Sequence, residues 1–172
     1  MRKNRPVKTM SKYLLLFLLY CKDSTGRPAN KLTPAEESAL ALFQAYRPNI
    51  ERDHGPVLYQ RTITGDLNGD SRPDVVIEFG IGSRGGGNGI LFKQAAIYLG
   101  TTNGVQVVGD FQPNFCFAVT EIKNRLVTVE ELEACIDPWP RVMAIHSYAF
   151  EKNGLIHKSG TRLTPPRETR PN

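Results

Sequence analysis

The sequence Asp66-Leu67-Asn68-Gly69-Asp70-Ser71-Arg72-Pro73-Asp74 runs directly into the apolar segment Val75–Phe79. Counted from Asp66, side-chain oxygens fall at positions 1, 3, 5 and 9, and a backbone carbonyl stands at position 7. This alternation is typical of the first part of an EF-hand-like loop, in which carboxylate, amide and carbonyl oxygens surround a hard cation. The segment therefore predicts a structural Ca²⁺ site with five ligands: Asp66, Asn68, Asp70, the carbonyl of Arg72, and Asp74.

The residues around these ligands also fit a loop that leads into a strand. Gly69 permits a sharp turn, because a residue without Cβ adopts positive φ at little cost. Position 12, where an EF-hand carries a bidentate Glu, is Ile77, and Val75–Phe79 is β-branched and aromatic without a helical period. We therefore expect a strand after the loop. The alternative is a metal-free hairpin in which Asp, Asn and Gly build the turn unaided.

The segment Thr64–Phe79 resembles the calcium loops of FG-GAP/VCBS-type repeats, which occur in integrin-like propellers and in secreted bacterial proteins. The resemblance implies that Asp66, Asn68, Asp70, Asp74 and the carbonyl of Arg72 are the metal ligands. A propeller needs several blades, whereas this chain holds one copy of the loop. The resemblance therefore implies the loop and not the propeller.

Short β-branched or aromatic segments with turn signals between them fill most of the chain. Asn103-Gly104 is a strong hairpin signal. The pattern predicts a mainly β (α+β) fold, an antiparallel domain of about seven to nine short strands. The expected strands are Leu58–Thr64, Val75–Phe79, Ile90–Leu99, Val105–Gly109, Cys116–Ile122, Leu126–Val129, Arg141–Phe150 and Leu155–His157.

One helix is expected before the strands. Thr33 is suited to the N-cap, Pro34 to the first helical position, and Glu36 completes a capping box. An apolar stripe at helical spacing predicts packing on the sheet, and its members are Ala39, Leu42, Phe43 and Tyr46. The dipeptide Arg47-Pro48 predicts the end of the helix, because the residue before a proline is disfavoured in the α region.

The first residues predict export. A basic stretch precedes the apolar segment Tyr13–Tyr20, as in a signal peptide over residues 1–21. Leu18–Cys21 resembles a bacterial lipobox, in which Cys21 would be acylated, although Tyr20 stands where a small residue is usual. Cleavage by ordinary signal peptidase and an uncleaved N-terminal anchor are the alternatives. We expect a periplasmic or cell-envelope protein, either a membrane-anchored lipoprotein or secreted.

The rest of the chain divides around the expected domain. Residues 22–31 are polar and predict a tether, residues 32–157 a single β-rich domain, and residues 158–172 a disordered tail.

The charge distribution argues against a nucleic-acid partner. The net charge is +5, but residues 1–21 hold five basic residues and no acidic one. The other 17 basic residues are matched by 17 acidic residues. The predicted domain therefore lacks the excess of positive charge that phosphate binding requires, and membrane contact is expected only through the lipid or leader.

The three cysteines agree with export. If Cys21 carries lipid, Cys116 and Cys135 remain for a disulfide in an oxidising compartment. Such a bridge closes a loop of roughly 20 residues and is expected to stabilise the fold by about 3 kcal/mol. Two buried thiols are the alternative.

Two further segments are candidates for contact with a protein or glycan partner. One is the Gly-rich loop Gly80–Gly89 with Arg84, and the other is Asp137–Pro140 with Trp139 between two prolines. Trp139 could instead plug one end of the sheet. No motif places a nucleophile beside a base, so a non-enzymatic, calcium-stabilised binding protein is the leading hypothesis.

A weaker similarity to periplasmic lysozyme inhibitors and immunity lipoproteins suggests a cell-wall hydrolase as the partner. Two other classes of function remain open. One is a calcium-dependent envelope hydrolase, with acid and base groups among Glu78, Asp53, His54 and Glu131. The other is a structural envelope component without a discrete ligand.

Overall fold

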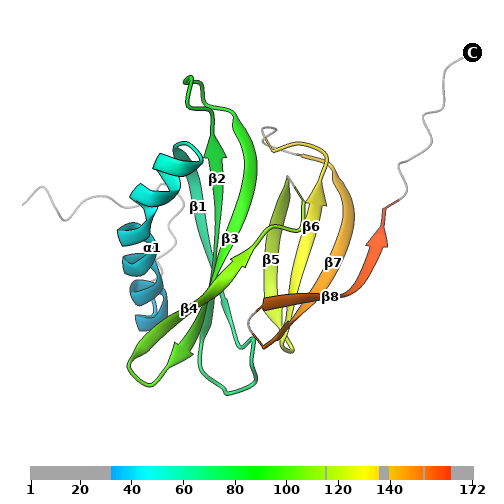
Figure 1. Ribbon diagram of the computed structural model, residues 1–172. Helices are drawn as coiled ribbons and strands as arrows, with labels where there is room; N and C mark the ends of the chain where they lie inside the picture. Colours follow the sequence, from blue (N-terminus) through cyan, green and yellow to red (C-terminus); the bar gives the residue numbers. More distant parts are fainter. Residues whose placement is uncertain (1–31, 115, 136–139, 153, 164–172) are drawn as a thin grey trace, which may run out of the picture. The chain divides into compact units, whose positions relative to one another are not determined.

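The computed structural model describes residues 32–114, 116–135, 140–152 and 154–163. Within these residues, one helix is followed by eight strands (Figure 1). The elements are α1 (Pro34–Asp53), β1 (Val57–Gly65), β2 (Asp74–Gly82), β3 (Ile90–Thr101), β4 (Gly104–Phe111), β5 (Phe117–Lys123), β6 (Leu126–Leu132), β7 (Val142–Glu151) and β8 (Gly154–Arg162).

The eight strands form two four-stranded sheets, in the orders β1-β2-β3-β4 and β5-β6-β7-β8. Every neighbouring pair is antiparallel, so each sheet is a meander of consecutive strands. The predicted mainly β fold with one N-terminal helix is confirmed. The predicted hairpin with the Asp66–Asp74 loop at its turn is also present, since β1 and β2 pair from Gly65↔Asp74 onward.

Helix α1 covers one face of the first sheet (Figure 1). Its buried residues Ala39, Phe43 and Ile50 join a core cluster with Ile77 and Phe79 of β2. The rings of Phe43 and Phe79 lie 5.1 Å apart between centroids. The predicted apolar stripe therefore packs on the sheet only through Ala39 and Phe43, because Leu42 and Tyr46 remain 42% and 61% exposed.

The helix does not end at Arg47-Pro48, as the sequence predicted, but continues through Pro48 to Asp53. Proline removes one backbone hydrogen bond, and tertiary contacts offset that loss. Ile50 is buried in the core beyond the proline. Glu51 accepts hydrogen bonds from Arg47 Nε at 2.8 Å and from the backbone N–H of Val57 at 3.2 Å. These contacts tie the last turn to β1.

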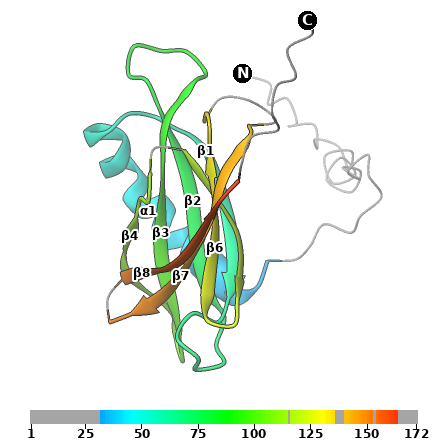
Figure 2. The same ribbon diagram turned by 90° about the vertical axis from the view of Figure 1, so that its right-hand side faces the viewer.

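The other face of the first sheet packs against the second sheet, as the two views of Figures 1 and 2 show. Val76 and Ile97 from the first sheet share a core cluster with Phe117, Val119 and Val129 from the second. Strand β2 is therefore buried along its whole length, from Asp74 to Gly82. The layers are helix, sheet and sheet, with β2 between both cores.

Two predicted boundaries were wrong in the same direction. Strand β2 runs to Gly82, so the Gly-rich loop begins later than Gly80. Strand β8 runs to Arg162, past the predicted end of the domain at residue 157. Residues 158–162 are polar, but they pair with β7 through the backbone, for example in Ala144↔Arg162. Residues 164–172 of the predicted tail lie outside the described residues.

The structure places Cys116 and Cys135 in a disulfide, with Cα atoms 5.1 Å apart. The bridge joins the segment before β5 to the segment after β6. A backbone hydrogen bond of 2.9 Å from Leu132 N to the Cys116 carbonyl closes the same end of the hairpin. The disulfide therefore reinforces a connection that the sheet already makes.

Replacing both cysteines, as Cys116→Ser with Cys135→Ser, should lower the free energy of unfolding by about 3 kcal/mol, because the unfolded chain regains the entropy of an open loop. Urea denaturation followed by circular dichroism measures this loss. The unchanged chain under reductant is the control and should match the double variant. An identical midpoint for all samples would show that the bridge carries no stability.

Candidate functional site

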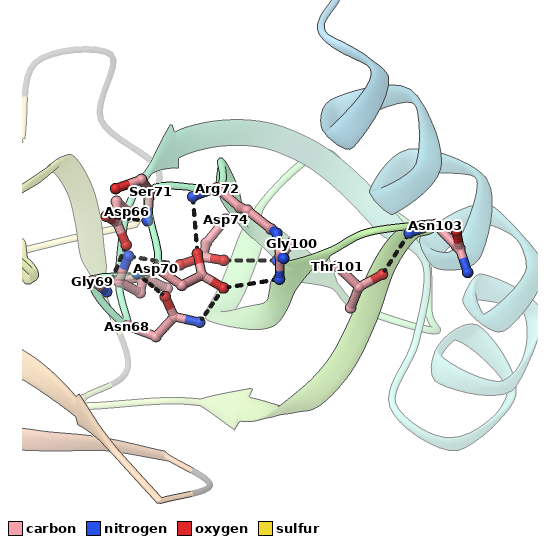
Figure 3. A network of polar contacts seen from close by, with 11 residues as sticks. Asp66, Asn68, Gly69, Asp70, Ser71, Arg72, Asp74, Gly100, Thr101 and Asn103 are labelled. Carbon is pink, nitrogen blue, oxygen red and sulfur yellow. Dashed lines mark hydrogen bonds and ion pairs between the residues drawn. The ribbon is translucent and has the colours of Figure 1, made fainter.

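The predicted calcium loop is a tight hairpin turn in which side-chain oxygens accept hydrogen bonds from the loop's own backbone (Figure 3). Asp66 accepts from Gly69 N at 2.6 Å and from Ser71 N at 3.0 Å. Asn68 Oδ1 accepts from Asp70 N at 2.9 Å, and Asp70 Oδ1 accepts from Arg72 N at 2.8 Å. Successive Asx turns therefore wind the loop so that Asp66, Asn68 and Asp70 gather on one side of it.

The backbone turns sharply at two loop residues with positive φ. Gly69 has φ 81°, and Ser71, at position 6, has φ 65°. In EF-hand loops the sharp turn also falls at position 6, where glycine is the rule. Ser71 adopts this conformation without being glycine, and its N–H donates to Asp66 as part of the same turn. The backbone therefore shares a feature of calcium loops that the spacing of ligands alone does not specify.

Asp74 differs from the other predicted ligands because it is fully buried. Its Oδ2 accepts from Leu67 N at 2.6 Å, and its Oδ1 accepts from Gly100 N at 2.7 Å. Burial raises the pKa of Asp74, while those backbone hydrogen bonds oppose the rise. The pKa of Asp70 is lowered, chiefly by the backbone N–H of Arg72. The two pKa shifts are opposite in direction, because burial dominates at Asp74 and backbone hydrogen bonding dominates at Asp70.

The donor set fits Ca²⁺ in chemistry, since carboxylate, amide and carbonyl oxygens are its usual ligands. Among the described residues, no three His, Cys, Asp or Glu side chains converge as a preformed metal group. Asp74 is directed at the backbone of Leu67 and Gly100. Coordination by all five predicted ligands would therefore require these oxygens to move toward a common point.

The loop is seated against both sheets. Leu67, at position 2, is buried in the core cluster between the sheets, where Ile122 also packs. Gly69 lies under the Arg125 side chain from the β5–β6 turn, so that a Cβ there would stand 2.9 Å from Arg125 Nε. Any ion held by the loop would therefore stabilise the contact between the two sheets.

A second polar cluster surrounds Glu78, which is fully buried in the middle of β2. Its Oε1 accepts from Lys93 Nζ at 3.0 Å. Its Oε2 accepts from Arg61 Nη2 and from the backbone N–H of Val119, each at 2.8 Å. The Lys93 ammonium also lies 5.1 Å from the centre of the Tyr59 ring. Both carboxylate oxygens are therefore satisfied.

This cluster fastens the edge of the second sheet to the face of the first. Strand β5 is an edge strand with a bulge after Val119, which leaves backbone groups without a neighbouring strand. Arg61 Nη2 also donates to the Val119 carbonyl at 2.6 Å. The pair of Arg61 and Glu78 thus satisfies both backbone groups of one edge residue.

A cavity of about 530 Å³ opens beside this cluster. Its lining joins Tyr59, Arg61 and Lys93 of the first sheet to Glu130 of the second. The remaining lining residues are Ile90, Ala118, Leu132, Cys135, Pro140 and Val142. We refer to this cavity as the inter-sheet pocket. It combines an aromatic ring, two cations and one carboxylate, which are groups that orient a polar ligand.

The inter-sheet pocket is lined by residues next to both segments predicted to contact a partner. Ile90 directly follows the Gly-rich loop, and Cys135 and Pro140 flank residues 136–139. Arg84, in the Gly-rich loop, donates from Nη2 to the Arg52 carbonyl at the end of α1. Trp139 lies outside the described residues, as does the predicted lipidation site Cys21.

The structure does not assemble the four acid and base candidates into one site. Glu78 lies between the sheets, whereas Asp53 pairs with Arg52 at the end of α1. The neighbouring His54 ring makes an edge contact with Phe92. Glu131 contacts His146 in the second sheet. The sequence analysis did not predict the ion pairs and hydrogen bonds of Glu78, although a single acid within an apolar strand is a signal for a buried ion pair.

A larger, more apolar cavity of about 660 Å³ lies between α1 and the first sheet. Leu42 and Tyr46 of the helix face Tyr98 and Val107 across it. Within the described part of the chain, no helix is long and apolar enough to cross a membrane.

Comparison with protein-family models, with curated proteins and with solved structures finds no match to this chain.

Substituting Glu78→Ala should lower the free energy of unfolding by about 3–5 kcal/mol, because Lys93 loses the counterion of its buried ammonium and Val119 N loses its acceptor. Chemical denaturation measures the loss. Glu121→Ala, at an exposed position of β5, is the matched control and should change stability by no more than about 0.5 kcal/mol. Equal effects of the two substitutions would contradict a structural role for Glu78.

Proposed function

We propose that this chain is an exported, calcium-stabilised binding protein of the bacterial envelope, with the inter-sheet pocket at the centre of its binding surface. The observation that carries the proposal is that residues adjoining both predicted partner segments line this pocket. Ile90 marks the end of one segment, and Cys135 and Pro140 flank the core of the other. Residues that adjoin two segments far apart in the sequence thus line one polar cavity.

The pocket suits a protein or glycan partner. The Tyr59 ring offers a stacking surface, and the exposed part of Arg61 offers donors beyond the Nη2 group that binds Glu78. Glu130 supplies an acceptor from the other sheet. Our specific form of the proposal is an inhibitor or immunity protein, in which loops around the pocket engage a cell-wall hydrolase.

Binding is favoured over catalysis by the state of Glu78. A general acid or base must exchange a proton with substrate or solvent within hydrogen-bond reach. Both oxygens of Glu78 are occupied by Lys93, Arg61 and Val119, and its side chain is fully buried. The remaining candidates Asp53, His54 and Glu131 stand apart from the pocket's cations.

The disulfide supports export, because disulfides persist in oxidising compartments. The lipobox-like Leu18–Cys21 would then provide the anchor, with Cys21 acylated. In this proposal the lipid holds the chain at the membrane and the β-rich domain extends into the periplasm.

Calcium would act as a structural ion at Asp66, Asn68, Asp70, Asp74 and the Arg72 carbonyl. The position of Leu67 in the inter-sheet core supports this role, since fixing the loop also fixes that side chain. The Asx turns already shape the loop through its own hydrogen bonds. A bound ion would replace the repulsion between the loop carboxylates with attraction of each to the cation.

Calcium titration by calorimetry, with melting curves in calcium and in chelator, tests the ion. At free calcium about 100 times Kd, stabilisation of about 2.7 kcal/mol is expected, which raises the melting temperature by about 5–11 °C. The double substitution Asp66→Asn with Asp70→Asn should abolish the rise. Asp110→Asn, at an exposed position in β4, should leave it intact. Identical melts in calcium and chelator would reduce the loop to a metal-free Asx hairpin.

The calcium effect should depend on pH through Asp74. Burial raises the folded-state pKa of Asp74 above its unfolded value, so its proton stabilises the calcium-free fold at low pH, and this stabilisation is lost as pH rises through the folded pKa. Because the ion must displace that proton, the gain in melting temperature with calcium should be larger at about pH 7 than at about pH 4. An equal gain at both would exclude Asp74 as a ligand.

The partner is tested with purified cell-wall hydrolases and with isolated peptidoglycan. Binding to the full chain in calcium should be lost when residues 84–88 are removed, which leaves β2 and β3 intact, and weakened by Glu130→Lys in the pocket. Glu121→Lys makes the same charge change elsewhere on the second sheet and should bind normally. Turnover of peptidoglycan by the pure protein would instead support the hydrolase alternative, and retention of binding by both variants would exclude the pocket.

A further inference from the structure

Two histidines meet side by side in the second sheet. His146 belongs to β7 and His157 to β8, and the strands pair antiparallel. The distance from His146 Nδ1 to His157 Nε2 is 3.2 Å. The Tyr148 ring packs edge-on against His157, with 5.2 Å between centroids, and so limits the orientations open to that imidazole.

The separation of the two nitrogens suits a shared metal ion. Zinc binds imidazole nitrogen at about 2.0–2.1 Å, so two ligands of a tetrahedral ion stand about 3.3 Å apart. The observed distance is close to this value. The two rings could therefore chelate an ion after small rotations about their side-chain bonds, without a change in the backbone.

A carboxylate contacts the His146 imidazole on the side opposite His157. Glu131 Oε2, on β6, lies 3.2 Å from His146 Nε2, the nitrogen that faces away from His157. Metal-binding histidines commonly donate their second N–H to a carboxylate, which fixes the tautomer and strengthens the ligand. When Nε2 donates its proton to Glu131, Nδ1 presents its lone pair toward His157.

Gly160 makes room for the His146 ring. This residue pairs with His146 across the β7–β8 ladder. A Cβ at Gly160 would overlap His146 Nδ1 and stand 3.3 Å from His157 Nε2. Because Gly160 has no side chain, the His146 ring can lie against the backbone of β8 with Nδ1 next to His157 Nε2.

We propose that His146 and His157 form a binding site for a divalent transition metal of the zinc class, with Glu131 as the residue that positions His146. Imidazole nitrogen favours Zn²⁺, Ni²⁺ and Cu²⁺ over Ca²⁺ and Mg²⁺, so this site is separate from the oxygen-rich Asp66–Asp74 loop in chemistry as well as in position. Among the described residues no three His, Cys, Asp or Glu side chains form a preformed metal group, and Glu131 contacts the nitrogen of His146 that faces away from His157. The ion therefore keeps positions open to water or to a group from a partner.

Access to the site is provided by partial exposure. The side chain of His146 is 24% exposed and that of Glu131 is 38% exposed. His157 is exposed at the edge strand of the sheet. Of the described residues, Glu131 from β6 and Tyr148 from β7 contact the pair, and neither brings a positive charge that would repel a cation.

Calorimetric titration of the full chain with Zn²⁺, in saturating Ca²⁺, tests the proposal. All samples carry Cys21→Ser, so that no leader thiol competes for the ion. One Zn²⁺ per chain is expected, with binding lost in His157→Gln and in His146→Ala. Gly160→Ala keeps both ligands but displaces the His146 ring, because the new Cβ would overlap Nδ1, and it should weaken binding at least about 10-fold. Glu131→Gln should weaken binding by about 10-fold through His146.

His54→Ala is the matched control, because it removes the only other histidine of the chain and should bind as the parent does. Melting curves show which variants fold, and the exposed substitution His157→Gln keeps the test decisive if His146→Ala does not. The absence of Zn²⁺ binding to the folded parent, or full binding by folded His157→Gln and Gly160→Ala, would overturn the proposal and leave a hydrogen-bonded histidine pair.

Discussion

Burial of the Glu78 carboxylate is the constraint on which the docking of the two sheets depends. Removing an ion from water costs several kcal/mol, and this cost is offset only when every partner stands in place. The partners are Arg61 on β1, Lys93 on β3 and the Val119 backbone on β5. Since β5 belongs to the other sheet, the carboxylate is fully compensated only when the sheets meet in one register. Apolar packing between Val76, Phe117 and their neighbours supplies the attraction but would tolerate sliding.

A second buried carboxylate fixes the start of the same strand. Asp74 starts β2 and accepts hydrogen bonds from Leu67 in the loop and from Gly100 on β3. The loop thereby holds Leu67 in the core between the sheets. Strand β2 is thus held by directional polar contacts at its start and at its centre, and by apolar packing along both faces. The proposed calcium ion would stabilise the start of β2, where one hairpin turn connects that strand to β1.

The same docking creates the inter-sheet pocket. Because the edge of β5 is fastened to the face of the first sheet through Arg61 and Glu78, neighbouring parts of the two sheets stand apart and leave a cavity lined by both. The pocket's cations are therefore partly structural, and a ligand would meet groups that are already held in position. Such preorganisation favours binding, since little side-chain freedom remains to be lost.

The sequence by itself determined the local elements: the capping box of α1, the strands on either side of the Asp66–Asp74 loop, and the meander of short strands. Each depends on neighbours in sequence, such as Thr33 with Glu36 or Asp66 with Ser71. Tertiary structure decided the rest. It extended α1 through Pro48, because Ile50 gains a core, and it extended β8 to Arg162, because backbone pairing does not need apolar side chains. It also gave Glu78 its partners and brought His146 to His157. Those contacts join residues from different strands and sheets, so their energies exist only once the sheets have formed.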